Sequence, residues 1–118
     1  MKYSDLVVWQ KSMDLVAKIY KVTVTFPSEE RFGLSSQIRR AAVSIPSNIA
    51  EGHGRKSTGA YINHLSIAHG SLMELETQIQ IALRLDFIVA TDGSTLLEQT
   101  DEIGKMLNGL KKSLSAKE

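Results

Sequence analysis

The stretch GHGRKST, from Gly52 to Thr58, contains residue types that bind phosphate. Glycines, two cations and hydroxyl side chains precede the expected start of a helix, where free backbone N–H groups attract anions. The phosphate-loop motif of nucleotide hydrolases needs a glycine directly before the lysine, and Arg55 stands there. We therefore interpret Arg55 and Lys56 as contacts for nucleic-acid phosphates, with a solvated turn as the alternative.

A second polar group lies just before this stretch. Residues three or four apart share one face of a helix, which places five polar residues in a stripe beside an apolar one: Gln37, Arg40, Ser44, Asn48 and Glu51. We expect the stripe to form a hydrogen-bonded seam against another helix, with Glu74 as the carboxylate partner of Arg40. Arg39 points elsewhere, so we interpret it as a third phosphate contact.

Other chemistry finds little support in the sequence. The chain has no cysteine, which excludes thiolate metal ligands and cysteine nucleophiles. His53, His64 and His69 lack the four-residue spacing that places two metal ligands on one helical face. No serine stands in a recognisable order with a histidine and an acid. We expect no metal, no cofactor and no enzymatic activity.

The residues between these groups predict an all-α fold. Apolar residues recur at spacings of three and four almost throughout the 118 residues. We expect one helix from Ser4 or Asp5 to about Phe26, a second that Ser28 caps and that ends at the glycines of EGHGRKS, and a third from Ser57 or Thr58 to about Phe87. The turn VATDGST (89–95) then precedes a fourth helix. Short loops between them predict a single domain over 1–118, an antiparallel up-down-up-down four-helix bundle.

Two features predict assembly of several copies. The first helix carries two apolar stripes, more than one bundle core requires: Leu6, Trp9, Met13, Val16 and Tyr20, and then Val8, Leu15, Ile19, Val22 and Phe26. Residues 31–73 have a net charge of +4 and residues 74–102 a net charge of −6, so the two segments can meet head to tail in a closed ring. Pro46 is expected to kink the second helix where it follows a neighbour.

The overall charge of +1 falls short of the basic excess of a dedicated nucleic-acid-binding domain. No apolar run is long enough for a secretory signal or a membrane span. We expect a cytoplasmic protein that makes no membrane contact.

Four stretches carry a family resemblance: LVVWQKSMDLVAKIY, FPSEERFGLSSQIRR, SIPSNIAEGHGR and HLSIAHGSLMELETQ. On these the chain resembles the four-helix-bundle proteins encoded in intervening sequences of bacterial 23S ribosomal RNA genes. The resemblance implies a homopentameric ring. It also implies kinship with the accessory variability determinant of diversity-generating retroelements, which partners a reverse transcriptase and binds nucleic acid. The matching residues are Arg39, Arg40, Ser44, Pro46, Asn48, Glu51, Gly52, Glu74 and Glu76.

We expect, in sum, a non-enzymatic accessory protein for RNA, DNA or a nucleoprotein enzyme, with Arg39, Arg55 and Lys56 on phosphate. The alternative is a structural protein-interaction scaffold without direct nucleic-acid binding. Salt dependence of binding separates the two classes, since phosphate contacts release counterions.

Overall fold

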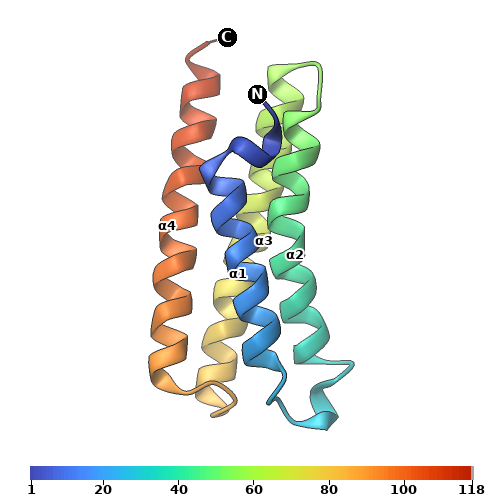
Figure 1. Cartoon of the computed structure of the whole chain (residues 1–118), viewed down its shortest axis with the longest axis vertical. Coiled ribbons are helices and arrows are strands. Elements are labelled where there is room, and N and C mark those ends of the chain that lie inside the picture. Colours follow the sequence, from blue (N-terminus) through green and yellow to red (C-terminus); the bar gives the residue numbers. More distant parts are fainter. Residues whose placement is uncertain (118) are drawn as a thin grey trace.

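The computed structural model describes residues 1–117, which form four long α-helices and no strand. The helices are α1 (Val7–Thr23), α2 (Leu34–His53), α3 (Thr58–Arg84) and α4 (Ala90–Ser115), and two short 3₁₀ turns accompany them, η1 (Tyr3–Asp5) and η2 (Ser28–Glu30). Consecutive helices run in opposite directions (Figure 1). The predicted all-α fold with four helices is confirmed, and its order is up-down-up-down.

The four helices form a closed, elongated bundle of 47 × 24 × 20 Å. α1 packs against α2 and α4, and α3 packs against the same two helices on the other side. One end of the bundle holds both chain ends and the α2–α3 loop, and we call it the termini end (Figure 1). The other, the link end, holds the α1–α2 link (24–33) and the α3–α4 loop (85–89).

The core consists of the predicted apolar stripes of the four helices. Its fully buried large side chains are Leu15, Ile19, Ile38, Ile45, Ile49, Leu65, Leu72, Leu75, Ile79, Leu96, Ile103 and Leu107. Each such side chain stabilises the fold by about 1.5 to 3 kcal/mol through burial. One stripe of α1 is buried in this core, whereas the other is only partly covered: Leu6, Trp9 and Val16 pack against the core, but Met13 and Tyr20 remain 44% and 43% exposed.

The start of α2 differs from the prediction. Ser28 begins the short turn η2 rather than capping the helix, and α2 starts six residues later at Leu34. The carboxylate of Glu30 accepts the backbone N–H of Leu34 at 3.0 Å, which satisfies one free donor of the first turn. The first helix likewise starts later than predicted, because Leu6 adopts an extended conformation between η1 and α1.

The start of α4 also differs from the prediction. The stretch ATDGST lies inside α4, and the chain reverses earlier, at Leu85–Val89. Asp86 adopts a left-handed conformation there, with φ of 60°. Gly93 is a helical residue of α4, and a side chain at this position would clash, because its Cβ would lie 2.4 Å from a methyl carbon of Leu83. The glycine that suggested a turn therefore allows α3 and α4 to approach closely.

Within the described residues, no helix has the length and hydropathy needed to cross a bilayer.

Candidate nucleic-acid interface

A polar seam joins α2 to α3 along the predicted polar stripe. The hydroxyl oxygens of Ser44 and Ser71 lie 2.8 Å apart across the two helices. Asn48 donates from Nδ2 to the backbone oxygen of Ser44 at 2.9 Å, and its Oδ1 lies 3.1 Å from Nδ1 of His64. We call Ser44, Asn48, His64 and Ser71 the polar seam. It satisfies polar groups that the packing of the two helices removes from water.

His64 is the centre of this seam at the termini end. Arg55 donates from Nε to Nε2 of the imidazole at 3.2 Å, so Nε2 must be an acceptor. The ring proton then sits on Nδ1, which donates to Oδ1 of Asn48. A carboxylate oxygen of Glu51 lies 3.6 Å from the same Nδ1. The histidine therefore holds Arg55 toward the body of the bundle.

The role of His64 as a bridge between Asn48 and Arg55 was not predicted, because the sequence analysis considered the histidines only as metal ligands or catalytic residues. The signal that the sequence does contain is its distance of seven residues from Ser71, which places both on the α2 side of α3.

The predicted buried link between Arg40 and Glu74 is not formed. Both side chains are exposed and line one open groove between α2 and α3, and no ion pair joins them within residues 1–117. Exposed ion pairs gain little over solvation by water, so nothing at this surface holds the two long side chains together. Arg40 and Glu74 therefore stand outside the polar seam, whereas Ser44 and Asn48 belong to it and Glu51 lies beside it, 3.6 Å from Nδ1 of His64.

Arg39 faces α1 rather than open solvent. Its Nε donates to the hydroxyl of Thr23 at 2.7 Å, and its guanidinium lies 4.7 Å from the centre of the Tyr20 ring. These contacts fix the side chain between the two helices. The remaining guanidinium nitrogens have no hydrogen-bond partner in the described part of the chain, so Arg39 combines a structural link with a cationic surface.

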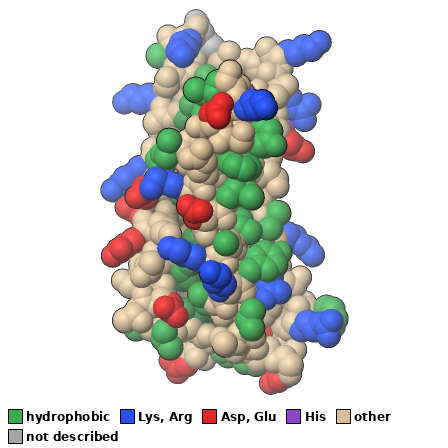
Figure 2. All heavy atoms as spheres, viewed as in Figure 1, with side chains coloured by type: hydrophobic (Ala, Val, Ile, Leu, Met, Phe, Trp, Pro, Cys, Tyr) green, Lys and Arg blue, Asp and Glu red, His purple; other side chains and the backbone are tan. Residues whose placement is uncertain are grey.

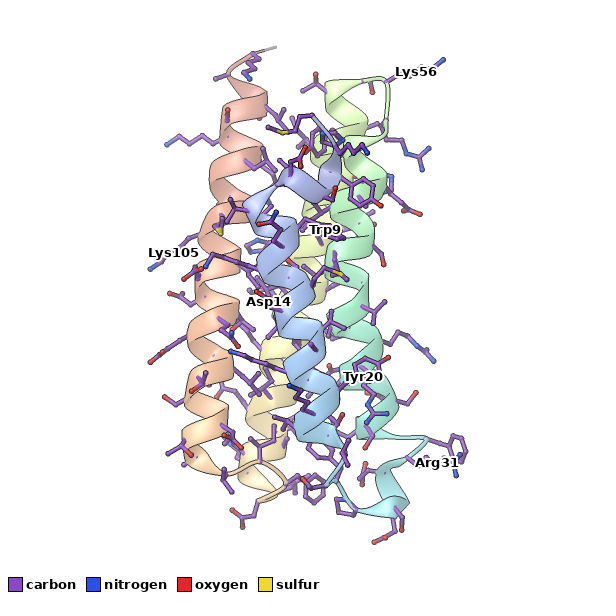
Figure 3. All side chains as sticks on the ribbon, viewed as in Figure 1. Trp9, Asp14, Tyr20, Arg31, Lys56 and Lys105 are labelled. Atoms are coloured by element: carbon purple, nitrogen blue, oxygen red, sulfur yellow. The ribbon has the colours of Figure 1, made fainter. Side chains whose placement is uncertain are left out.

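The three predicted phosphate contacts do not converge on one site. Lys56 projects from the termini end, next to Arg55, whereas Tyr20, which Arg39 covers, lies toward the link end (Figure 3). Ser57 caps α3 by accepting the N–H of Ala60 at 3.1 Å, which occupies one of the donors that could have met an anion. The cations thus form two groups at opposite ends of the bundle.

The group at the link end lines a surface groove between α1, the link and α2. We call it the arginine groove, and its lining residues are Tyr20, Arg31, Phe32, Ser36, Arg39, Arg40 and Val43. No carboxylate is among them. Arg31 places its guanidinium 5.3 Å from the centre of the Phe32 ring, and Phe32 is 88% exposed.

A second groove continues along the α1–α2 boundary toward the termini end. We call it the apolar groove, and its lining residues are Tyr3, Trp9, Met13, Val16, Val43, Pro46, Ser47 and Ala50. Hydrophobic side chains form a band over this boundary (Figure 2). The partly exposed α1 stripe that contains Trp9, Met13 and Val16 contributes to it, and so does the buried Pro46 of the unbroken α2 helix.

Two ionisable side chains have shifted pKa values. Burial raises the pKa of Tyr61, which lies edge-on to His53 near the end of α2. Burial lowers the pKa of His69, the charge of Lys111 lowers it further, and Glu76 acts in the opposite direction. No group of three metal-binding side chains occurs among residues 1–117.

The comparisons with known proteins agree with this fold. A solved structure from Bacteroides thetaiotaomicron, described as a protein of unknown function from the S23 ribosomal protein family, is 29% identical to this chain with a TM-score of 0.84. The alignment covers 95% of this chain and 99% of that chain. No curated protein matches the sequence. A model of the 23S rRNA-intervening sequence proteins matches residues 4–109, and the chain therefore belongs to the 23S rRNA-intervening sequence protein family.

Proposed function

We propose that the protein is a non-enzymatic accessory protein that assembles as a closed ring and binds nucleic acid through phosphate contacts. The proposal depends chiefly on the cations of α2 and its flanking loops, which are Arg31, Arg39, Arg40, Arg55 and Lys56. Residues 31–56 contain a single carboxylate, and none of these five cations forms an ion pair within residues 1–117. Cations without an acidic partner remain available to phosphate.

Assembly is supported by two separate apolar surfaces. One is the apolar groove between α1 and α2. The other is a stripe on α3, in which Ile67 and Ile81 are 46% and 43% exposed and stand seven residues on either side of Glu74. Because Glu74 lines a groove with α2, this stripe belongs to the face next to the first surface. Two different surfaces favour head-to-tail contacts.

The positions of these surfaces favour a small closed ring over a filament. Two contact surfaces on adjacent faces point in different directions, so each head-to-tail contact turns the next copy by a large angle and the copies close after a few subunits. The pentamer that the family resemblance implies is such a small ring, and a ring repeats each weak cationic contact around its rim.

The test combines light scattering after gel filtration with filter binding to structured RNA and duplex DNA at two salt concentrations. Binding should weaken steeply with salt, by about 0.7 to 0.9 in logarithmic slope per phosphate contact. The double variant Arg55→Ala/Lys56→Ala should flatten this slope and leave the ring intact. Lys18→Ala/Lys21→Ala is the matched control, since it removes the same charge from α1, away from the α2–α3 loop.

The second candidate function is a protein-interaction scaffold, which the same two apolar surfaces favour. A ring that binds neither RNA nor DNA at low salt would support the scaffold and refute the accessory function. A monomer at micromolar concentration would refute the ring that both the accessory function and the scaffold function assume. A reverse transcriptase or another nucleoprotein enzyme is the protein partner that we propose for the accessory function.

A further inference from the structure

The arginine groove has a composition that the phosphate contacts alone do not explain. It combines three guanidinium groups with two aromatic rings and contains no acid. A solvated surface would normally intersperse both signs of charge, and a large aromatic ring such as Phe32 would normally be more covered than 12%. The groove therefore offers flat apolar faces beside concentrated positive charge.

We propose that the arginine groove binds single-stranded nucleic acid, with a base stacked on Phe32 and the flanking phosphates on Arg31, Arg39 and Arg40. Unpaired bases stack on aromatic side chains and on guanidinium planes, and cations beside these platforms hold the backbone. This inference rests on the proposed function, and it adds a ligand class and a site that Arg55 and Lys56 do not form.

The geometry makes part of this site rigid before any ligand arrives. Arg39 is held by the hydroxyl of Thr23 at 2.7 Å and by the ring of Tyr20 at 4.7 Å. Its other guanidinium nitrogens make no hydrogen bond within residues 1–117 and keep their donors for a phosphate. Binding to a group that is already ordered loses less conformational entropy than binding to a mobile side chain.

The exposed ring favours a single strand over a duplex. In a duplex the bases are stacked on each other, and only their edges and the backbone reach the surface. Phe32 would therefore add no affinity for a duplex beyond the phosphate contacts of the arginines. Arg31 stacks against this ring at 5.3 Å, and this stacking leaves most of the ring in solvent.

A subunit contact is the competing explanation for an exposed phenylalanine. It would bring three guanidinium groups without acids against another copy of the chain, and burying unpaired charge is costly. The exposed stripe of α3 offers one carboxylate, Glu74, between Ile67 and Ile81. The charge of the groove therefore fits a polyanion better than it fits this stripe.

The experiment measures fluorescence anisotropy with a labelled, unstructured RNA of roughly 20 nucleotides, alone and annealed to its complement. The full chain is compared with Phe32→Ala, with Phe32→Tyr, which keeps a ring, and with Val24→Ala. Val24 lies on the same link and is 72% exposed, but it does not line the groove. Light scattering gives the oligomer mass of each variant.

We expect Phe32→Ala to weaken binding of the single strand by about 5- to 150-fold, the usual effect of removing one stacked aromatic. Duplex binding should change far less. Phe32→Tyr and Val24→Ala should bind like the original chain, and all masses should agree.

Three results would overturn the inference. If Phe32→Ala binds the single strand normally while Arg55→Ala/Lys56→Ala does not, the proposed function stands and the groove is not the site. If Phe32→Ala lowers the oligomer mass, the aromatic ring of Phe32 is part of a subunit contact and not a stacking site. If the original chain binds neither probe, the proposed function fails together with this inference.

Discussion

Gly52 of α2 lies close against α3 beside the polar seam, so Gly52→Ala is a sharp test of the packing. A Cβ at this position would lie 2.8 Å from Cβ of His64, 3.0 Å from a ring carbon of Tyr61 and 3.2 Å from the backbone oxygen of Tyr61. Ordinary contacts of a methyl group are near 3.5 to 4 Å. Because two of the three atoms are close to or part of the backbone of α3, a rotamer change cannot relieve the overlap.

The expected effect follows from two opposing contributions. Alanine in a helix is about 1 kcal/mol more favourable than glycine. Overpacking of a tight contact costs about 1 to 3 kcal/mol. We expect Gly52→Ala to lower the free energy of unfolding by about 1 kcal/mol, up to about 2 kcal/mol, and to disturb the bond between His64 and Arg55.

The matched control is Gly109→Ala, because nothing lies within 4 Å of a Cβ on Gly109 and the residue is inside α4. This variant should gain about 0.5 to 1 kcal/mol. Urea unfolding followed by circular dichroism at one fixed chain concentration compares the two, since oligomers unfold in a concentration-dependent way. If Gly52→Ala is stabilised as much as Gly109→Ala, the close approach of α2 and α3 at this point is wrong.

Three further predictions follow from the contacts described above. Arg40→Ala should change the unfolding free energy by less than about 0.5 kcal/mol, because the side chain is exposed and unpaired. A loss of about 2 kcal/mol in thermal melts would contradict this and would indicate that Arg40 and Glu74 form a buried pair. Arg39→Ala should cost about 1 to 2 kcal/mol in the same melts through loss of the Thr23 bond and the Tyr20 contact, and Arg39→Lys should recover little of it. The pKa of His69 is lowered in the folded chain, so the unfolded chain takes up the proton first as pH falls through about 6.5, and stability should fall from there toward the folded-state pKa. His69→Gln should remove this part of the pH dependence in melts between about pH 7 and 5, and an unchanged profile would contradict it.

The sequence predicted the core well because helical periodicity reports burial directly. The stripe residues Ile38, Ile45 and Ile49 in α2, and Leu65 and Leu72 in α3, are fully buried. Periodicity gives the angle of each residue relative to the core. Periodicity does not identify the neighbouring helix that a given side chain contacts.

The surroundings of Arg39, Gly93 and Glu74 depend on this missing information. Arg39 was correctly placed off the polar stripe, but only the fold brings it to Thr23 of α1. Gly93 reads as a turn residue locally, and its actual role depends on Leu83 from the preceding helix. Glu74 shares a groove with Arg40 without the burial that would force the two to pair. Each case depends on a contact between residues from different helices.

The two flanks of α2 explain why the cations of α2 and its adjoining loops avoid the middle of this helix. The flank toward α3 is occupied by Ser44 and Asn48, whose polar groups satisfy each other and those of α3. The flank toward α1 is apolar near its middle, around Val43 and Pro46. A cation in either place would have to be desolvated against a neighbouring helix, which is costly without a partner. The cations accordingly stand outside this middle stretch, with Arg39 and Arg40 in the second turn of α2 and Arg31, Arg55 and Lys56 in the adjoining loops, so the two groups lie toward opposite ends of a bundle 47 Å long. In the proposed ring these groups form two separate cationic rims, and a nucleic acid that contacts both must run along the wall of the ring.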